Sequence, residues 1–548
     1  MPPSTLCLTL PSTHPFHISR LQEWHENVLP SLMDFIRVPN LSPAFDDAWD
    51  SNGHQIEAFD LVTKWAKAQN LENCKVELLK DDGRTPLLFM EVEPRESEQV
   101  CMLYAHIDKQ PPMGAWREGL GPCDPVVQDG KLYGRGAVDD GYGFFSAITS
   151  IKAIQEQGLP CPRIVMLFEG CEESGSRDLP HYMDKLSGRI GTPDLIVCLD
   201  AGCGNYEQLW MTTSLRGSTN VMVNVSMLTA GAHSGFASGI VPSSFRITRQ
   251  LLSRLEDEET GIVKPDKFFV EIPKSRLEQT AAAAEILGNS VYKQFPFVEG
   301  GHPVAKDAPI SEHLLAKAWR PALSVTGADG LPATAVAGNV MLPFTKLKLS
   351  MRLPPTLDAK QASQDMAEIL TRDPPQGAHI TVTPGPAGNG WHAPLEAEWL
   401  SEAVHKASLT FFGKPSAHLG EGGSIPFMGM LKNMFPSAQF LVTGAAGPGN
   451  CMHAPNENLH IDYSARLTMC VTQVVATLAT TKVVEEAAAT EGGQVRAPKR
   501  SFIDAFKQSG GDSKYFVGCD CGMAGCVIFD QGLEKTVCPP CPPSVAAS

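Results

Sequence analysis

Two adjacent carboxylates, Asp139 and Asp140, stand in the stretch LYGRGAVDDG (132–141), between a glycine-rich turn and an apolar pattern with helical spacing. Charged side chains lose their water only when they are paired or bound to a metal, so two of them beside a core are costly. The simplest interpretation is a helix N-cap, because an aspartate there accepts backbone N–H bonds and complements the helix dipole. A metal site is favoured if other segments deliver histidines and carboxylates to the same place.

Four other segments carry such groups, either where a predicted strand ends or in a loop. They are His106 and Asp108 after the strand 100–105, Glu172 and Glu173 after 163–168, Asp200 after 195–199, and His453 in the loop PGNCMHAPNEN. Each has an ordinary interpretation by itself, as a structural histidine or a solvated carboxylate. His106 and Asp108, two residues apart, point to the same side of the strand, and a carboxylate on the far nitrogen of a histidine holds a metal ligand in one tautomer.

Strands and helices alternate along the first part of the chain, which indicates an α/β sheet with helices on both faces. Ligands of such sheets bind beyond the carboxyl ends of the strands. Two histidines, two terminal carboxylates and one shared aspartate would satisfy a pair of zinc sites, with water in the open positions. Glu172, which is adjacent to a ligand but not needed as one, is a natural general base for a metal-bound water.

The texture of the sequence changes near Leu215 and returns to the α/β pattern near Trp391. Between these points we predict a few strands, two helices and a less regular charged stretch. The chain therefore divides into a discontinuous catalytic domain (1–213 and 386–483), an inserted α+β domain (214–385), a linker (484–513) and a Cys-rich tail (514–548).

Composition limits the partners and the compartment. The 548 residues include 61 acidic and 45 basic ones, and the formal charge of -16 argues against nucleic acid or an anionic membrane as a partner. No apolar run is long enough to span a bilayer, and the first residues lack a basic segment that leads into an apolar one. Ten of the 15 cysteines are scattered, several in apolar segments, as expected in a reducing compartment. We predict a soluble, cytoplasmic protein.

Seven motifs together resemble a known family. YAHIDKQPP, LYGRGAVDDG, FEGCEESGS, LIVCLDAG, GAHSG, GEGGSIP and MHAPNEN occur in this order across residues 21–480. They are similar to motifs of the co-catalytic zinc peptidase family that contains carnosine dipeptidases, aminoacylases and glutamate carboxypeptidases of the carboxypeptidase G type. The resemblance implies a zinc-peptidase catalytic domain, with a mixed central sheet flanked by helices and an inserted α+β lid or dimerisation domain.

The resemblance also implies roles for the candidate residues. Asp139 would bridge two divalent metals, zinc with manganese or cobalt as alternatives, and its link to Asp140 would be a cis peptide. His106 and Asp200 would complete one metal site, and Glu173 and His453 the other. Asp108 would orient His106, and Glu172 would be the general base.

The inserted domain would supply substrate contacts. His233 of GAHSG would reach the active site of the partner subunit in a homodimer and polarise the scissile carbonyl, although a turn histidine is the ordinary interpretation. Arg352 lies on the polar face of a predicted strand, a pattern that by itself predicts solvent exposure. In the family it would clamp a substrate carboxylate, with Gly422, Gly423 and Ser424 offering amides and a hydroxyl to the same group.

Three positions depart from the family pattern. Gly141 stands where many relatives have lysine, Ala105 stands where many have glycine, and Lys109 is unusual immediately after the His-x-Asp unit. None removes a predicted ligand or the base, so these departures bear on substrate preference rather than on catalysis.

The tail is not explained by the resemblance. Its cysteines have roughly zinc-like separations and would form either a small zinc knuckle or a flexible tail with reactive thiols. They are Cys519, Cys521, Cys526, Cys538 and Cys541.

These observations predict an enzyme that hydrolyses the amide bond of dipeptides or similar C-terminal amino-acid amides. A water that bridges two metals would attack the carbonyl, with Glu172 as the base. Deacylation of N-acyl amino acids would use the same machinery with a different pocket. An inactive metal-binding partner protein is a third hypothesis, against which the intact Glu172 argues.

Overall fold

The computed structural model describes residues 22–481, 517–518 and 527–528. Apolar residues at helical spacing predict a first helix over residues 17–36. The start of this range and the predicted linker lie outside the described residues. So do the five cysteines of the predicted knuckle, Cys519, Cys521, Cys526, Cys538 and Cys541. The short strands β19 (Val517–Gly518) and β20 (Val527–Ile528) pair in antiparallel fashion.

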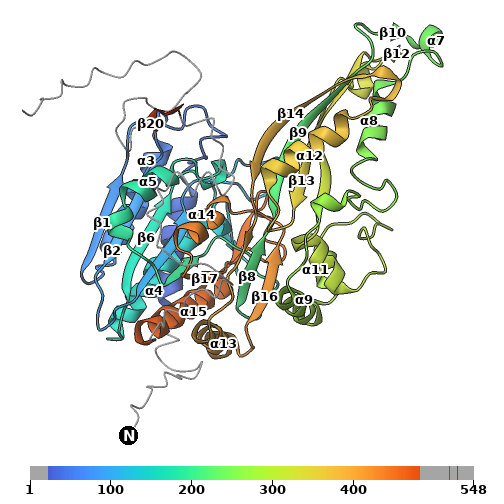
Figure 1. Ribbon diagram of the computed structural model, residues 1–548. Coiled ribbons are helices and arrows are strands. Elements are labelled where there is room, and N and C mark those ends of the chain that lie inside the picture. Colours follow the sequence, from blue (N-terminus) through green and yellow to red (C-terminus); the bar gives the residue numbers. More distant parts are fainter. Residues whose placement is uncertain (1–21, 482–516, 519–526, 529–548) are drawn as a thin grey trace, which may run out of the picture.

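A six-stranded mixed sheet forms the centre of the larger body (Figure 1). In spatial order its strands are β1 (Cys74–Leu79), β2 (Leu87–Val92), β6 (Arg163–Glu169), β3 (Val100–His106), β7 (Leu195–Cys198) and β17 (Gln439–Val442). The last four are parallel to one another, whereas β1 and β2 pair in antiparallel fashion. The carboxyl ends of the four parallel strands therefore meet at one edge of the sheet.

Both faces of this sheet are covered, as predicted. Leu103 and Ala105 of β3 pack on one face, and Met102 and Tyr104 pack on the other, because successive side chains of a strand point to opposite sides. The first face is covered by α2 (Leu29–Ile36), α3 (His54–Ala68), α4 (Tyr142–Glu156), α13 (Glu398–Phe412) and α15 (Ile461–Thr480). The second is covered by α5 (Leu179–Lys185), α6 (Ser187–Ile190) and α14 (Pro426–Met434).

Two small sheets complete the body. One consists of β18 (Asn458–His460), β5 (Lys131–Tyr133) and β4 (Val126–Gln128), and it joins the chain just before Asp139 to the chain just after His453. The other consists of β15 (Trp391–His392), β8 (Trp210–Leu215) and β16 (Ala417–Glu421).

Helices also occur in the stretch 256–320, where the sequence showed little regularity. They are α9 (Lys274–Leu287), α10 (Ser290–Lys293) and α11 (Ile310–Ala318), and α9 and α11 pack against β16. The alanine-rich sequence of α9, KSRLEQTAAAAEIL, has few large apolar side chains, so no apolar stripe marked it as a helix.

An elongated α+β unit extends from this body (Figure 1). Its antiparallel sheet has the order β11 (Ala322–Asp329), β13 (Phe344–Leu353), β9 (Gly217–Ser226) and β14 (His379–Gly388). The helices α8 (Ser244–Leu252) and α12 (Ala359–Thr371) cover one face, where Leu347, Leu349 and Met351 are buried. At its far end lie β10 (Ala232–His233), α7 (Ser234–Ala237) and β12 (Val340–Met341).

The described helices give no sign of a membrane span. None of those between residues 22 and 481 combines the length and the apolar composition that crossing a bilayer requires.

Candidate metal centre

His106 ends β3 at the carboxyl edge of the central sheet and is fully buried. Its Nδ1 lies 3.0 Å from the main-chain oxygen of Asp108 and 3.4 Å from the Asp108 carboxylate. Because both are acceptors, Nδ1 carries the hydrogen. Nε2 is therefore free to bind a cation on the opposite side of the ring.

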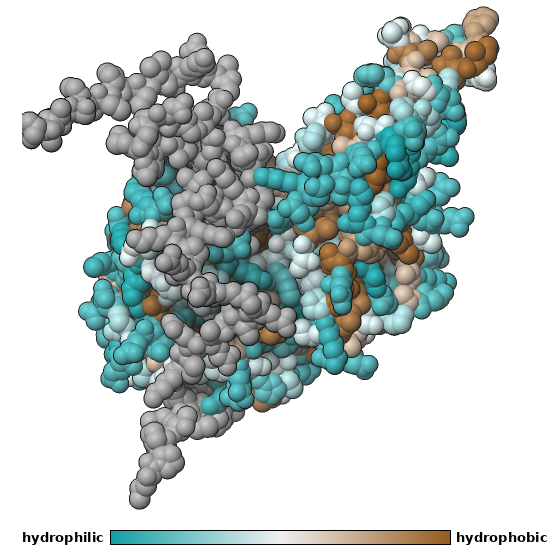
Figure 2. Space-filling model, viewed as in Figure 1, coloured by the Kyte–Doolittle hydropathy of each residue, from teal (hydrophilic) through white to brown (hydrophobic). Residues whose placement is uncertain are grey.

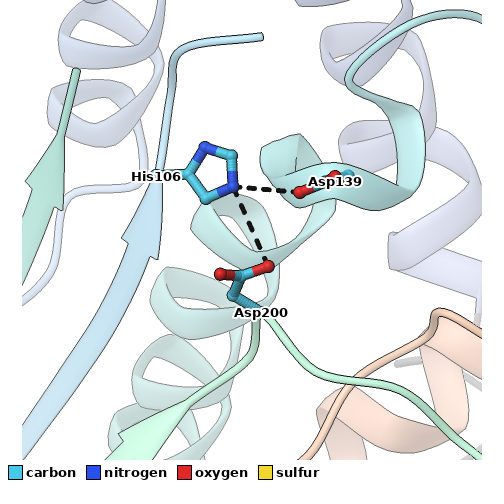
Figure 3. A group of neighbouring side chains, drawn as sticks. All are labelled: His106, Asp139 and Asp200. Atoms are coloured by element: carbon cyan, nitrogen blue, oxygen red, sulfur yellow. Dashed lines mark hydrogen bonds and ion pairs between the residues drawn. The ribbon is translucent and has the colours of Figure 1, made fainter. Parts of the chain in front are cut away.

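The Asp139 carboxylate lies between two groups of potential ligands. Its Oδ1 is 3.0 Å from Nε2 of His106, and its Oδ2 is 2.7 Å from Nε2 of His453. Asp200 joins the first group, 3.8 Å from Nε2 of His106, and Figure 3 shows these side chains converging from three segments. Glu173 joins the second group, with Oε1 3.4 Å from Nε2 of His453. Each group is compact enough to hold one metal ion, and the two groups share Asp139.

The protonation of these groups reflects crowding of like charges. Burial raises the pKa of Asp200 and Glu173, and the neighbouring carboxylates raise it further. Burial also opposes charge on Asp139, but hydrogen bonds from His106 and His453 hold its pKa well below the usual range. Burial disfavours charge on His453, yet Asp139 and Glu173 raise its pKa to about 10. The centre thus has an excess of negative charge that suits cations.

The donor atoms fit a pair of divalent metals. Asp139 Oδ2 and Glu173 Oε1 are buried and both face the same nitrogen, Nε2 of His453, so a cation between these three atoms would satisfy both oxygens. Histidine nitrogen with carboxylate oxygen is a donor set that zinc, manganese and cobalt all accept. The residues therefore fit two divalent metal ions, and they are those named from the sequence.

The loop that carries Glu172 and Glu173 is fixed by Asp108. One carboxylate oxygen of Asp108 accepts the main-chain N–H of Glu172, and the other accepts that of Glu173, both at 3.0 Å. Burial and the nearby Asp200 raise the pKa of Glu172 well above its usual value. Asp108 therefore does more than contact His106, and only the folded chain shows this because the partners are 64 and 65 residues apart.

Asp140 has a different task from Asp139. Its Oδ2 accepts the main-chain N–H of His106 at 3.3 Å, and its side chain lies against Gly143 at the start of α4. A side chain at Gly143 would approach Asp140 Oδ1 to 2.4 Å, so this position requires glycine. Neither aspartate makes a side-chain hydrogen bond that caps α4, and the peptide bond between the two is cis.

Arg352 and Ser424 lie together, as expected for a common binding role. Arg352 Nη1 donates to Ser424 Oγ at 3.4 Å, and Ser424 Oγ in turn donates to the main-chain oxygen of Arg216. Gly422 is part of the same cluster, because its main-chain oxygen accepts from Arg216 Nε at 3.3 Å, and Gly423 follows it. Burial and the neighbouring Arg352 lower the pKa of Arg216 to about 10. Arg216 had no signal in the sequence beyond its place next to Leu215, where the texture changes.

His233 is not brought to the metal centre of its own chain. It lies in β10 at the far end of the inserted unit, where it is exposed and its Nδ1 accepts the N–H of Gly235 at 3.1 Å. The described contacts of this chain are those of the predicted turn histidine.

The three residues that depart from the family pattern are buried. Lys109 is fully buried, donates to the main-chain oxygens of Phe35 and Val38 at 2.8 and 2.7 Å, and has its ammonium 4.0 Å from the centre of the Phe35 ring. A side chain at Gly141 would meet the same ring at 2.6 Å. Ala105 is buried in the core. Lys109 and Gly141 therefore shape packing against α2.

Comparison with known proteins identifies similar sequences. The model of the family described as Peptidase family M20/M25/M40 matches residues 102–477. The Cysteinylglycine-S-conjugate dipeptidase of Corynebacterium striatum is 25% identical over 411 residues, which cover 73% of this chain and 85% of the relative. The Beta-Ala-His dipeptidase of Homo sapiens is 27% identical over 395 residues, which cover 68% and 74%.

Solved structures share the fold. Human carnosine dipeptidase 1 superimposes with a TM-score of 0.67 at 20% identity and covers 84% of this chain and 98% of its own. The M20 family metallo-carboxypeptidase Sso-CP2 from Sulfolobus solfataricus gives 0.65 at 19% identity, covering 82% and 98%. The catalytic-plus-insert architecture expected from the motifs is therefore confirmed.

Proposed function

Because the chain belongs to peptidase family M20/M25/M40 and is a hydrolase of that family, we propose that it cleaves the amide bond of dipeptides or similar C-terminal amino-acid amides. The observation that supports this most is the position of Asp139, which lies between two groups of ligands. Both relatives described above carry dipeptidase names.

Five residues would hold the metals in this proposal. His106, Asp139 and Asp200 would bind one ion, and Asp139, Glu173 and His453 would bind the other. When bound, two divalent ions, zinc with manganese or cobalt as alternatives, would polarise the substrate carbonyl and lower the pKa of water. His106 is held for this role by Asp108.

Glu172 would carry the proton in the reaction. Its carboxylate would take a proton from the attacking water and deliver it to the leaving nitrogen. The nitrogen needs this proton because it is a poor leaving group without it. The two bonds from Asp108 to the main chain fix where this loop lies. Burial and Asp200 raise the pKa of Glu172, so its protonated form is accessible between these two transfers.

Arg352 would recognise the C-terminal carboxylate of the substrate. Its planar guanidinium can bind a carboxylate through two parallel hydrogen bonds. The Ser424 hydroxyl and the neighbouring Gly422 and Gly423 amides would bind the same group, and Arg216 adds a second positive charge behind them. A free carboxylate next to the scissile amide is common to dipeptides and N-acyl amino acids, so this site serves both substrate hypotheses.

A second copy of the chain would complete the site. Phe236, Ile240 and Val336, at the far end of the inserted unit, are 84%, 82% and 78% exposed. Figure 2 shows hydrophobic surface at this end, and the ring of His233 lies 5.2 Å from that of Phe236. Exposed apolar side chains of this size mark interaction surfaces. In a homodimer that covers them, His233 would reach the partner's metal centre and stabilise the oxyanion.

We further propose that the protein works in the cytoplasm. All nine cysteines within the described residues are free thiols, and six are buried, which suits a reducing compartment.

The test is a substrate panel on the metal-loaded protein and on its Glu172→Gln variant. We expect the wild-type protein to hydrolyse dipeptides faster than N-acetyl amino acids, and to lose affinity for dipeptides whose C-terminus is amidated. Glu172→Gln should keep both metals and lower kcat by about 10²–10⁴. Faster release of acetate than cleavage of dipeptides would favour the deacylase. Unchanged turnover in Glu172→Gln would exclude the mechanism.

A further inference from the structure

A buried ion pair lies directly beneath the metal centre. Arg135 Nη1 contacts Glu457 Oε2, and the two side chains are only 3% and 0% exposed. Neither residue belongs to the two groups of metal ligands. The pair therefore acts on the centre through the main-chain groups that it bonds.

Glu457 holds the backbone that leads into Asp139. Its second oxygen, Oε1, accepts the main-chain N–H of Gly136 at 3.0 Å and of Val138 at 3.2 Å. Val138 immediately precedes Asp139 in the chain. Hydrogen bonds to a charged acceptor are stronger than neutral ones, so this carboxylate fixes the entry to the shared ligand from two points.

Arg135 holds two other loops of the centre. Its Nη2 donates to the main-chain oxygen of Ala454 at 3.2 Å, and Ala454 immediately follows His453. The same nitrogen donates at 2.9 Å to Pro111, in the loop that follows Asp108. The pair thus connects three segments that carry proposed ligands or their supports.

The loop around His453 needs such support. Cys451, His453 and Asn456 have φ values of 55°, 58° and 67°, in the left-handed region that residues other than glycine rarely adopt. Such backbone persists only where the surrounding structure holds it in place. The contact to Ala454 and the pairing of β18 with β5 on either side of the ion pair meet this need.

Stability alone does not account for the pair. Replacing a buried ion pair by apolar residues is often neutral or stabilising, because two charges must lose their water. An ion pair that also bonds four main-chain groups in three ligand-bearing loops is better suited to fixing geometry.

We propose that Arg135 and Glu457 are positioning residues that set the distance between Asp139 and His453, and thereby make the Asp139, Glu173 and His453 group able to retain its metal. The proposal rests on the dinuclear function proposed above. Its larger effect is expected at the site that contains His453, because Arg135 bonds the residue next to this ligand, whereas His106 and Asp200 receive no bond from the pair.

The experiment measures metal content and metal affinity in Arg135→Lys and Glu457→Gln. Lysine keeps the charge but cannot bond Glu457, Ala454 and Pro111 together, and glutamine keeps an acceptor for Gly136 while losing the charge. We expect both variants to hold about one ion per chain, where the wild type holds about two. The weaker ion should bind about 10–100-fold less tightly, and high metal concentration should restore kcat.

Arg163→Lys is the matched control. Arg163 donates to Glu91 at 3.0 Å and to the main-chain oxygens of Ile190 and Arg189, but it lies at the opposite end of β6 from the metal centre. It should lower thermal stability while both ions stay bound. If Arg135→Lys and Glu457→Gln also lose only stability and bind both ions with wild-type affinity, the positioning role is wrong. If the wild type itself binds no pair of ions, the proposed function fails instead.

Discussion

The carboxyl edge of the central sheet and the far end of the inserted unit differ in how completely one chain satisfies them. At the sheet edge, five candidate ligands converge within one chain. Asp108 of the same chain fixes the loop of Glu172 and Glu173 by accepting their main-chain N–H groups. At the far end, His233 and several apolar side chains are exposed to solvent. One chain therefore carries every candidate metal ligand, whereas the proposed stabilisation of the oxyanion requires a second chain.

The largest effect that separates these regions is expected for His233→Ala. The variant should bind metals like the wild type, because no described contact joins His233 to the ligand groups. Its kcat should fall by about 10²–10³, the usual loss of one oxyanion donor.

Subunit mixing decides whether His233 acts on the partner's site. A mixture of His233→Ala with Glu172→Gln should regain about one quarter of wild-type activity, because half of the dimers are mixed and each has one complete site. Mixing either variant with itself is the control. No recovery in a mixture that forms mixed dimers would place His233 in its own chain's site or outside catalysis.

A smaller effect is expected for Lys109→Met, which tests whether the departures beneath the centre govern stability. Burial lowers the pKa of Lys109 from 10.5 to about 7. Between these values the unfolded chain keeps a proton that the native chain has lost, so Lys109 makes stability rise with pH in this window. The slope is at most about 1.4 kcal/mol per pH unit.

Lys109→Met should remove this contribution to the pH dependence of the free energy of unfolding. Denaturant titrations of the variant and the wild type, from roughly pH 6.5 to 9.5, cover most of the window in which linkage predicts the difference. The order of preference among dipeptides should stay the same. A changed order with an unchanged pH dependence would return Lys109 to the role of a substrate determinant.

The sequence predicted those features that depend on local pattern. The strands Val100–His106, Arg163–Glu169 and Leu195–Cys198 end within one residue of the predicted ranges 100–105, 163–168 and 195–199, because short β-branched and apolar runs stand between turn residues. The candidate ligands could be named because each stands at a strand end or in a motif. His106 differs only in that it forms the last residue of β3 rather than following it.

Features that depend on contacts between distant segments could not be predicted. The strands β8 and β16 pair across about 200 residues, and Arg135 meets Glu457 over a separation of 322. Which of two adjacent aspartates faces Nε2 of His106 and which accepts the main-chain N–H of His106 was also open, since it depends on how the chain turns between them. Arg216 and the support that Asp108 gives to Glu172 belong to the same class.

The most direct test of the account is the metal content of Asp139→Asn. Asparagine keeps the size of the side chain but loses the charge that both groups share. The account predicts that both ions are lost together and that hydrolysis disappears, while circular dichroism shows a folded chain. Retention of one tightly bound ion per chain would contradict the role of Asp139 as the ligand common to both metals.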